Sequence, residues 1–302
     1  MILQEAEKDE KNLRRRRIRY IKKLVSEALS VRKVIHVRRH TRKESVIDID
    51  KEDVNNSLAV VEYVEDLYKF YKLAESSSRV GDYIDLQFDI NEHTRMVLVN
   101  WLIDFHKKLK LSPEVLYLAV YIIDRYLAMR LVPRKDLFLV GISAMVIAGK
   151  YEEDSPPKVK EYITMAEGVD KKDQILAMEK AVLEKLDWTL AVPTTYHFLV
   201  RFIKAAVADK EMEDMSFFMA ELGLMKYAMI NYSPSMLAAS AVYAAKYSLK
   251  MTPLWNETLK YHTGFSEFQV IECAKQLTSF HSEAAHQLWA SYRKYMSCWL
   301  TL

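Results

Sequence analysis

Apolar residues recur every three or four positions along most of this sequence, the spacing that gathers them on one face of an α-helix. The first such stretch covers residues 56–73, where Asn56 or Ser57 supplies a polar cap at the start. Its apolar positions are Val60, Val61, Val64, Leu67, Tyr68 and Tyr71. We therefore predict one amphipathic helix here, followed by a loop over residues 76–81.

Beyond residue 85 the pattern predicts helix after helix with short breaks, in two groups. The helices of the first group start near Asn91, Pro113, Pro133, Ser155 and Val169. The second group starts near Thr194 and continues past Pro234, Pro253 and Ser266 to about Trp299. Residues typical of a helix N-terminus occur at Ser112-Pro113, Pro193-Thr194 and Ser233-Pro234.

The two groups look like copies of one unit. Residues 137–151 (LFLVGISAMVIAGKY) and 235–247 (SMLAASAVYAAKY) are apolar on all sides until a terminal Lys-Tyr. A helix without a polar face must be surrounded by other helices. Small residues that would let a neighbour approach are Gly141, Ala144 and Ala148 in the first and Ser240 and Ala244 in the second. We predict two helical bundles, each built around one central helix.

The charge distribution separates residues 1–45 from the rest of the chain. Between Lys11 and Lys43 there are 14 Lys and Arg residues and one acid, Glu27, a local charge of +13. Because the net charge is +3, the remainder carries −10. No packed domain is expected at that charge density, so we predict a flexible basic tail. Its centre is either a solvated run of charge or a nuclear-import signal, formed by Arg14, Arg15, Arg16 and Arg17.

The sequence lacks the motifs of common enzymes. It contains no Gly-rich phosphate loop and no HExxH, GxSxG or CxxC. His281 and His286 are five residues apart, the wrong spacing for two metal ligands on one helix face, so we predict no metal and no cofactor. No apolar run reaches the roughly 20 residues that span a bilayer. The acidic body offers nucleic acid no broad positive face, which leaves another protein as the expected partner.

Two charged residues fall in apolar surroundings. Lys150 ends the apolar stretch 137–151, and Glu179 lies within the apolar stripe of a predicted helix over 175–186. A carboxylate in such a stripe costs several kcal/mol unless it is paired, and Lys150 is the candidate partner. The two residues either form an internal ion pair that ties two helices, or lie on an exposed apolar surface and meet a partner protein.

The predicted helix over 95–109 presents a tryptophan beside a carboxylate. Its polar stripe contains Asn100, Asp104, Lys107 and Lys108. Val97 and Trp101 lie at the edge of this stripe, next to Asp104. Such an edge is either a shallow groove for a peptide or simply a partly covered tryptophan.

Three ordered segments carry a family resemblance. Residues 94–102 (TRMVLVNWL) resemble the MRAILVDWL segment of the cyclin box, 149–153 (GKYEE) its CKYEE or SKFEE segment, and 177–183 (AMEKAVL) its RMEKxIL helix. With residues 46–75 and parts of the second group added, the chain resembles mitotic B-type cyclins, most closely those of plants, over about 46–295.

The resemblance implies an all-α fold of two tandem five-helix cyclin boxes preceded by one amphipathic helix. The expected parts are a basic tail over 1–45, the helix and a linker over 46–84, a kinase-binding box over 85–191 and a second box over 192–302. A protein of this kind is a non-catalytic subunit that binds and activates a cyclin-dependent serine/threonine kinase and recruits its substrates. We expect it to control the G2/M transition and to occur in nucleus and cytoplasm.

The resemblance also assigns side chains to two surfaces. The kinase-binding residues would be Lys150, Tyr151, Glu152, Glu153, Glu179 and Trp188. A groove for substrates and inhibitors with an Arg-x-Leu motif would involve Arg95, Val97, Leu98, Trp101, Asp104, Arg134 and Leu137. Four of these would hold the Leu, namely Val97, Leu98, Trp101 and Leu137, whereas Asp104 would attract the Arg.

Some positions depart from the family pattern. They are Thr94 for Met, Met96 for Ala, Asn100 for Asp, Gly149 for Cys or Ser, and Phe138 at a position that is often polar. No destruction box of the form RxxLxxxxN precedes residue 46. The RxxL matches at Arg95 and Arg134 fall in predicted helices, which a ubiquitin ligase could not readily reach.

Two other hypotheses fit a double cyclin box. An orphan cyclin would act as a helical scaffold without activating a kinase. A general transcription factor of this architecture would need a basic second box and usually a zinc ribbon, whereas this body is acidic and the chain has only two cysteines, Cys273 and Cys298. So few cysteines, late in the chain, also indicate a reducing compartment.

Overall fold

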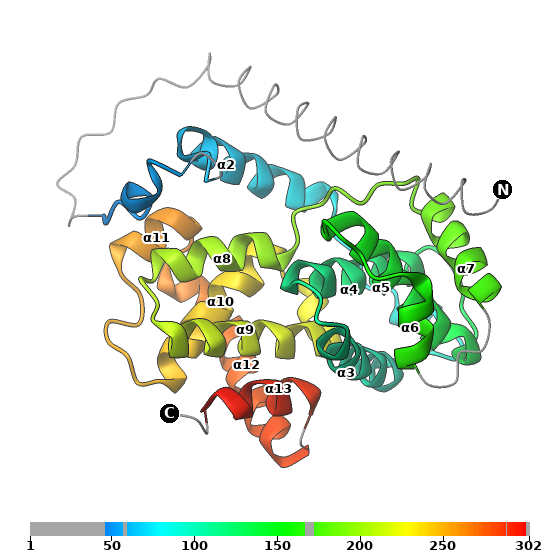
Figure 1. The fold of residues 1–302 in the computed structure, drawn as a ribbon. Helices are drawn as coiled ribbons and strands as arrows, with labels where there is room; N and C mark the ends of the chain where they lie inside the picture. Colours follow the sequence, from blue (N-terminus) through cyan, green and yellow to red (C-terminus); the bar gives the residue numbers. More distant parts are fainter. Residues whose placement is uncertain (1–45, 57–58, 167–171, 288, 300–302) are drawn as a thin grey trace.

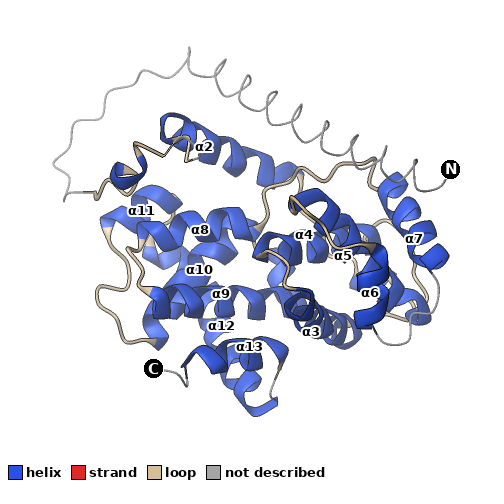
Figure 2. Ribbon diagram, viewed as in Figure 1, coloured by secondary structure: helices blue, strands red, loops and turns tan. Residues whose placement is uncertain are grey.

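The computed structural model describes residues 46–56, 59–166, 172–287 and 289–299. Over these residues the secondary structure is helical, with no strand (Figure 2). Two bundles lie side by side, and a separate helix, α2 (Val61–Ser77), runs along the second bundle toward the first (Figure 1). The predicted all-α fold of two tandem bundles is confirmed. The basic tail, with the possible import signal at Arg14 to Arg17, lies outside the described residues.

The first bundle consists of α3 (Glu92–Leu109), α4 (Pro113–Leu127), α5 (Leu137–Glu152), α6 (Val159–Ala166) and α7 (Lys172–Lys185). The second consists of α8 (Thr195–Ala205), α9 (Lys210–Met225), α10 (Pro234–Ser248), α11 (Glu257–Thr263) and α12 (Glu267–Gln287). A further helix, α13 (Ala290–Trp299), follows α12. Short 3-10 turns cover Lys51–Asp53, Ile84–Leu86, Arg134–Asp136 and Tyr227–Asn231.

The predicted helix starts at Pro113 and Pro234 are confirmed, whereas the helix predicted near Pro133 begins at Leu137 after a 3-10 turn. Pro113 and Pro234 are the first residues of α4 and α10, where a missing N–H removes no hydrogen bond from the helix. The Ser233 hydroxyl accepts a hydrogen bond from the Met236 N–H at 3.3 Å. Thr194 is the N-cap residue of α8.

The bounds of α2 differ from the prediction. The helix begins at Val61 rather than near Asn56, because Val60 has a left-handed backbone with a φ of 47° that cannot belong to the helix. It also continues through the predicted loop as far as Ser77. The Ser77 hydroxyl donates to the Ala74 carbonyl at 2.9 Å, which satisfies this polar side chain within the last turn.

The stretch from Ser266 to about Trp299 contains two helices. We predicted that the second group continues past Ser266 to about Trp299, without a helix start in between, and in the structure α12 ends at Gln287 and α13 begins at Ala290. The Ala290 N–H donates at 2.7 Å to the side-chain oxygen of Asn100, which lies 190 positions earlier in the chain. A cap supplied by a distant helix leaves no local pattern, so the sequence does not reveal the break.

The two predicted central helices, α5 and α10, are buried along most of their length. Each carries a serine hydroxyl that donates to a carbonyl of a neighbouring helix: Ser143 to Ile175 of α7 at 3.4 Å, and Ser240 to Val270 of α12 at 3.3 Å. The small residues allow close packing, since a Cβ on Gly141 would lie 2.8 Å from Leu98. Because α5 and α10 make equivalent contacts in their bundles, the structure supports the predicted internal repeat.

A buried ion pair joins the two bundles. Arg95 of α3 donates to both carboxylate oxygens of Asp124 of α4, at 2.6 and 2.7 Å. The same guanidinium donates to the carbonyls of Leu224 and Met225 at the end of α9, at 3.0 and 3.3 Å. The Tyr83 hydroxyl donates to the carboxylate at 2.7 Å. Both buried charges are therefore compensated at the junction of α3, α4 and α9.

Residues 46–56 and α2 are held on the second bundle by polar contacts. Asp50 accepts hydrogen bonds from Arg201 of α8 at 2.5 and 2.7 Å and from Lys204 at 2.8 Å. Burial raises the pKa of Asp50, but the hydrogen bonds from Arg201 and Lys204 outweigh burial and lower that pKa to about 2. Near the end of α2, the Glu75 carboxylate accepts from the Ser235 hydroxyl of α10 at 2.7 Å.

Gly149 of α5, which replaces the family's Cys or Ser, faces Tyr162 of α6. A Cβ at this position would lie 2.3 Å from the Tyr162 hydroxyl. That hydroxyl is buried and has no hydrogen-bond partner among the described residues. We expect Gly149→Ala to lower the free energy of unfolding by about 1–3 kcal/mol through overpacking, as measured by urea denaturation.

Tyr162→Phe is the matched control for this prediction. It removes the clashing oxygen and keeps the ring, whose nearest carbon lies 3.5 Å from the same Cβ. We expect Tyr162→Phe to restore most of the stability that Gly149→Ala loses. An undiminished loss in the double variant would show that a different contact resists the added methyl group.

Candidate functional site

The C-terminal end of α5 and the inner face of α7 form the first candidate surface. Ile175, Val182 and Leu183 of α7 are buried, as predicted, and Glu179 falls in the same stripe. The Glu179 carboxylate accepts a hydrogen bond from Lys150 Nζ, in the last turn of α5, at 2.7 Å. The Lys150 side chain is 21% exposed and the Glu179 side chain 10%. The pair ties α5 to α7 and also reaches the surface. This geometry is compatible with both hypotheses, an ion pair that joins two helices and a pair that meets a partner protein.

The remaining residues predicted for kinase binding follow α5 or α7 closely. Tyr151 and Glu152 are the last residues of α5, Trp188 lies three residues beyond α7, and all three are half-buried. Glu153 has a structural role that the sequence did not indicate, because its carboxylate accepts from the Ser112 N–H at 2.6 Å. It thereby ties the end of α5 to the start of α4.

The second bundle lacks an equivalent charge pair. Glu179 of α7 lies four residues after the carbonyl that Ser143 contacts. In α12 the residue four positions after the corresponding carbonyl is Ala274, which is buried. Lys246, near the end of α10, is only 5% exposed, and burial lowers its pKa. The two bundles thus share the packing of their central helices, whereas the Lys150–Glu179 charge pair belongs to the first bundle.

The outer edge of α3 and the start of α5 form the second candidate surface. Trp101 stacks on Phe105 with ring centroids 4.7 Å apart, and Phe138 meets it edge-on at 5.3 Å. Trp101 is half-buried, whereas Val97 and Phe138 are 41% and 40% exposed. These three residues, Val97, Trp101 and Phe138, define an apolar patch at the surface.

Several residues assigned to the groove do not line this patch. Leu98 and Leu137 are buried, so they support the surface from below instead of contacting a ligand. The assignment of Arg95 is corrected: its side chain is 3% exposed and lies in the ion pair with Asp124, because a buried guanidinium needs its compensating carboxylate. Arg134 is exposed in the 3-10 turn before α5.

Asp104 carries a contact that the sequence did not predict. Its carboxylate pairs with Arg293 of α13. One turn earlier on α3, Asn100 caps the same helix at Ala290. Helix α13 therefore runs along the polar stripe of α3, beside the apolar patch. Because Asp104 and Arg293 are 189 positions apart, helical periodicity could not reveal this pairing.

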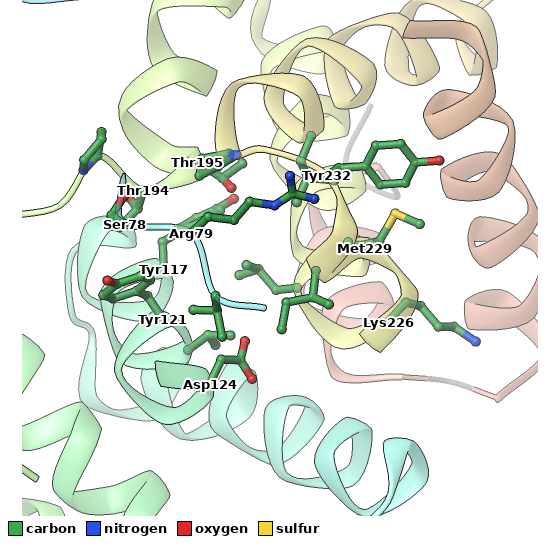
Figure 3. Close-up of a pocket in the computed structure, with 18 of the residues that line it drawn as sticks. Ser78, Arg79, Tyr117, Tyr121, Asp124, Thr194, Thr195, Lys226, Met229 and Tyr232 are labelled. Atoms are coloured by element: carbon green, nitrogen blue, oxygen red, sulfur yellow. The ribbon is translucent and has the colours of Figure 1, made fainter. Parts of the chain in front are cut away.

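A cavity of about 110 Å³ lies between the bundles, beside Arg95 and Asp124 (Figure 3). Arg79 extends across it in Figure 3 and donates to the Asn231 carbonyl. Lys226, which also lines the cavity, has a carboxylate partner. The basic side chains around this cavity thus all contact acceptors within the protein. We therefore regard the cavity as part of the junction between the bundles.

Other kinds of site receive no support from the described residues. Among them, no three His, Cys, Asp or Glu side chains gather as a metal site would require. In the same part of the chain, no helix combines the length and the apolar character needed to cross a membrane.

Two family models match the chain. Residues 66–191 match the N-terminal domain of cyclins and residues 193–299 match the C-terminal domain. Among solved structures, a viral cyclin from herpesvirus saimiri superposes with a TM-score of 0.65 at 19% identity, covering 72% of this chain and 96% of its own. A chain of the yeast RNA Pol II CTD kinase CTDK-1 complex gives a TM-score of 0.53 at 16% identity, covering 69% and 70%. At such identities these two structures show the fold alone.

Curated relatives are much more similar in sequence. The G2/mitotic-specific cyclin S13-6 of Glycine max is 54% identical over 254 residues, which are 84% of this chain and 56% of that protein. Cyclin-B1-1 of Arabidopsis thaliana is 53% identical over 82% of this chain and 56% of its own length. The G2/mitotic-specific cyclin S13-7 of Glycine max is 57% identical over 76% of this chain and 90% of its own. The chain thus spans little more than half the length of the first two relatives.

The two matched domains correspond to the two helical bundles of the structure, and the resemblance to plant B-type cyclins that the sequence indicated is confirmed by the relatives. The chain belongs to the cyclin family, with plant G2/mitotic B-type cyclins among its relatives.

Proposed function

We propose that this chain is the regulatory subunit of a cyclin-dependent serine/threonine kinase, which it binds and activates at the G2/M transition. The observation that carries the proposal is the Lys150–Glu179 pair, which reaches the surface of the first bundle and has no equivalent in the second. The names of the relatives, G2/mitotic-specific cyclins, support the timing.

The pair is suited to hold a segment of a partner in place. A lysine ammonium has three N–H donors, so Lys150 can donate to Glu179 and still offer donors to a backbone carbonyl of the kinase. Because Glu179 already fixes the ammonium, less conformational entropy is lost on binding. A kinase helix held against α5 and α7 would bring its own glutamate toward the ATP-binding lysine, which is the step that activates such kinases.

Substrate recruitment is the second part of the proposal. The patch of Val97, Trp101 and Phe138 offers apolar contact to a leucine side chain, and Asp104 offers a carboxylate to an arginine. Trp101 of the apolar patch and the Asp104 carboxylate lie within about one turn of α3, since residues three apart on a helix are neighbours. This spacing suits a short Arg-x-Leu segment of a substrate or inhibitor.

Affinity purification of the chain from dividing cells, followed by a histone phosphorylation assay, tests the main proposal. We expect a cyclin-dependent kinase to co-purify and the bound fraction to phosphorylate histone. A kinase that binds and stays inactive would instead favour the scaffold hypothesis. Recovery of no kinase at all would contradict the proposed function.

Trp101→Ala is expected to separate recruitment from activation. We expect the variant complex to keep its activity on a short peptide that lacks a docking motif. Its activity on a protein substrate with an Arg-x-Leu motif should fall by about tenfold or more, because a tryptophan anchor dominates a small interface. Steady-state phosphorylation rates of the two substrates measure the difference.

Phe268→Ala is the matched control, since Phe268 is an aromatic side chain on α12 of the second bundle and is 87% exposed. We expect this variant to phosphorylate both substrates at the wild-type rate. If Trp101→Ala reduces both activities equally, the groove assignment is wrong and Trp101 serves folding or kinase binding.

A further inference from the structure

The polar stripe of α3 is already occupied by a segment of the same chain. The Ala290 N–H, at the start of α13, donates to Asn100 at 2.7 Å. One turn along both helices, Arg293 pairs with Asp104. An arginine therefore already sits on the carboxylate that the proposed docking groove offers to an incoming arginine.

Helix α13 is anchored elsewhere by stronger contacts. On its other side, Lys294 and the Tyr295 hydroxyl both reach the Glu221 carboxylate of α9, the tyrosine at 2.8 Å. Glu221 is 1% exposed, so this charge depends on its partners from α13. The Ser291 hydroxyl also donates to the Met225 sulfur at 3.7 Å. These contacts hold α13 against the second bundle independently of Arg293.

The Arg293–Asp104 pair, in contrast, lies at the surface. The Arg293 side chain is 48% exposed and the Asp104 side chain 37%. Exposed ion pairs contribute little to stability, because water and salt screen the two charges and both side chains lose rotamer freedom. Arg293 can therefore leave Asp104 while α13 remains in place.

We propose that Arg293 acts as an internal competitor for the arginine subsite of the docking groove, so that a docking segment binds only by displacing it. The inference rests on the proposed function of the groove and adds its regulation. A segment gains access to Asp104 when it supplies both an arginine and an apolar side chain for the patch of Val97, Trp101 and Phe138. A segment that offers the arginine alone exchanges one exposed ion pair for another and gains little.

A double-mutant cycle tests this competition. Fluorescence anisotropy is measured with the full chain and a labelled peptide that contains Arg-Ala-Leu. Arg293→Gln should tighten binding by about two- to fivefold, the range that an exposed ion pair can supply. Asp104→Asn should weaken binding, and Arg293→Gln should have no effect in the Asp104→Asn background.

Two controls separate competition from a general change in charge. Arg130→Gln makes the same charge change at another exposed position, after the end of α4, and should leave the affinity unchanged. A peptide with Gln-Ala-Leu should bind wild type and Arg293→Gln equally, since it has no cation to compete for Asp104. Thermal unfolding of each variant verifies that α13 stays packed.

The outcomes distinguish this inference from the proposed function. If wild type binds the Arg-Ala-Leu peptide and Arg293→Gln binds it no better, the groove stands and the competition is refuted. If neither protein binds the peptide, the recruitment proposal fails and the inference fails with it. Tighter binding that persists in the Asp104→Asn background would also overturn the inference, because the effect would not pass through that carboxylate.

Discussion

Arg95→Met is expected to lower the free energy of unfolding by about 3–5 kcal/mol, the largest stability effect that we predict for this chain. The substitution leaves the carboxylate of Asp124, whose side chain is 9% exposed, without its cation. It also removes the donor to the carbonyls of Leu224 and Met225, so α9 loses hydrogen bonds to α3. Urea denaturation followed by far-UV circular dichroism measures the loss.

Two variants show whether the uncompensated charge causes the effect. Combining Arg95→Met with Asp124→Leu removes both charges and should recover much of the lost stability. Arg130→Met, at an exposed arginine, should change the free energy of unfolding by no more than about 0.5 kcal/mol. If Arg95→Met lowers the free energy of unfolding by less than about 1 kcal/mol, the ion pair contributes little to the stability of the junction between the bundles.

The kinase affinity is expected to fall about 30-fold or more when Lys150 is replaced with methionine, and similarly for Glu179→Met. Each change leaves one charge of the pair without its partner at a surface that the kinase would cover and desolvate. Part of the cost also appears in the free chain, since the Glu179 side chain is only 10% exposed. Surface plasmon resonance with the purified kinase measures the affinity, and thermal unfolding measures the stability.

The double variant Lys150→Met with Glu179→Met separates the two hypotheses for this pair. Removing both charges keeps the stem of each side chain between α5 and α7, so the free chain should regain stability. We nevertheless expect the double variant to bind the kinase as weakly as the single ones, because the donors for the kinase are gone. Wild-type affinity in the double variant would show that the pair serves only to tie the two helices.

The features that the sequence predicted correctly rest on local rules. Helices start at Pro113 and Pro234 because proline suits the first turn, and this depends on neighbouring residues alone. The burial of α5 follows from its lack of a polar face. The pairing of Lys150 with Glu179 could be inferred because a lone carboxylate in an apolar stripe requires a cation nearby.

The features that the sequence did not reveal depend on contacts between distant segments. Arg95 belongs to the same motif as Trp101, yet its side chain is buried against Asp124 of α4, which compensates its charge. The partner of Asp104 lies 189 positions later, on a helix whose start is itself set by α3. Glu153 caps α4 through a hydrogen bond that spans 41 positions. Periodicity describes one helix at a time and cannot select partners among helices.

The Arg95 junction also determines when the first bundle can be completed during synthesis. The guanidinium is translated 129 and 130 residues before the two carbonyls of α9 that it contacts. At about 5–20 residues per second, an interval of roughly 6–26 s passes between them. Until α9 is translated, the side of α3 that it contacts in the folded protein has no partner from the second bundle. The native packing of this side of α3 therefore requires translation of the second bundle as far as Met225.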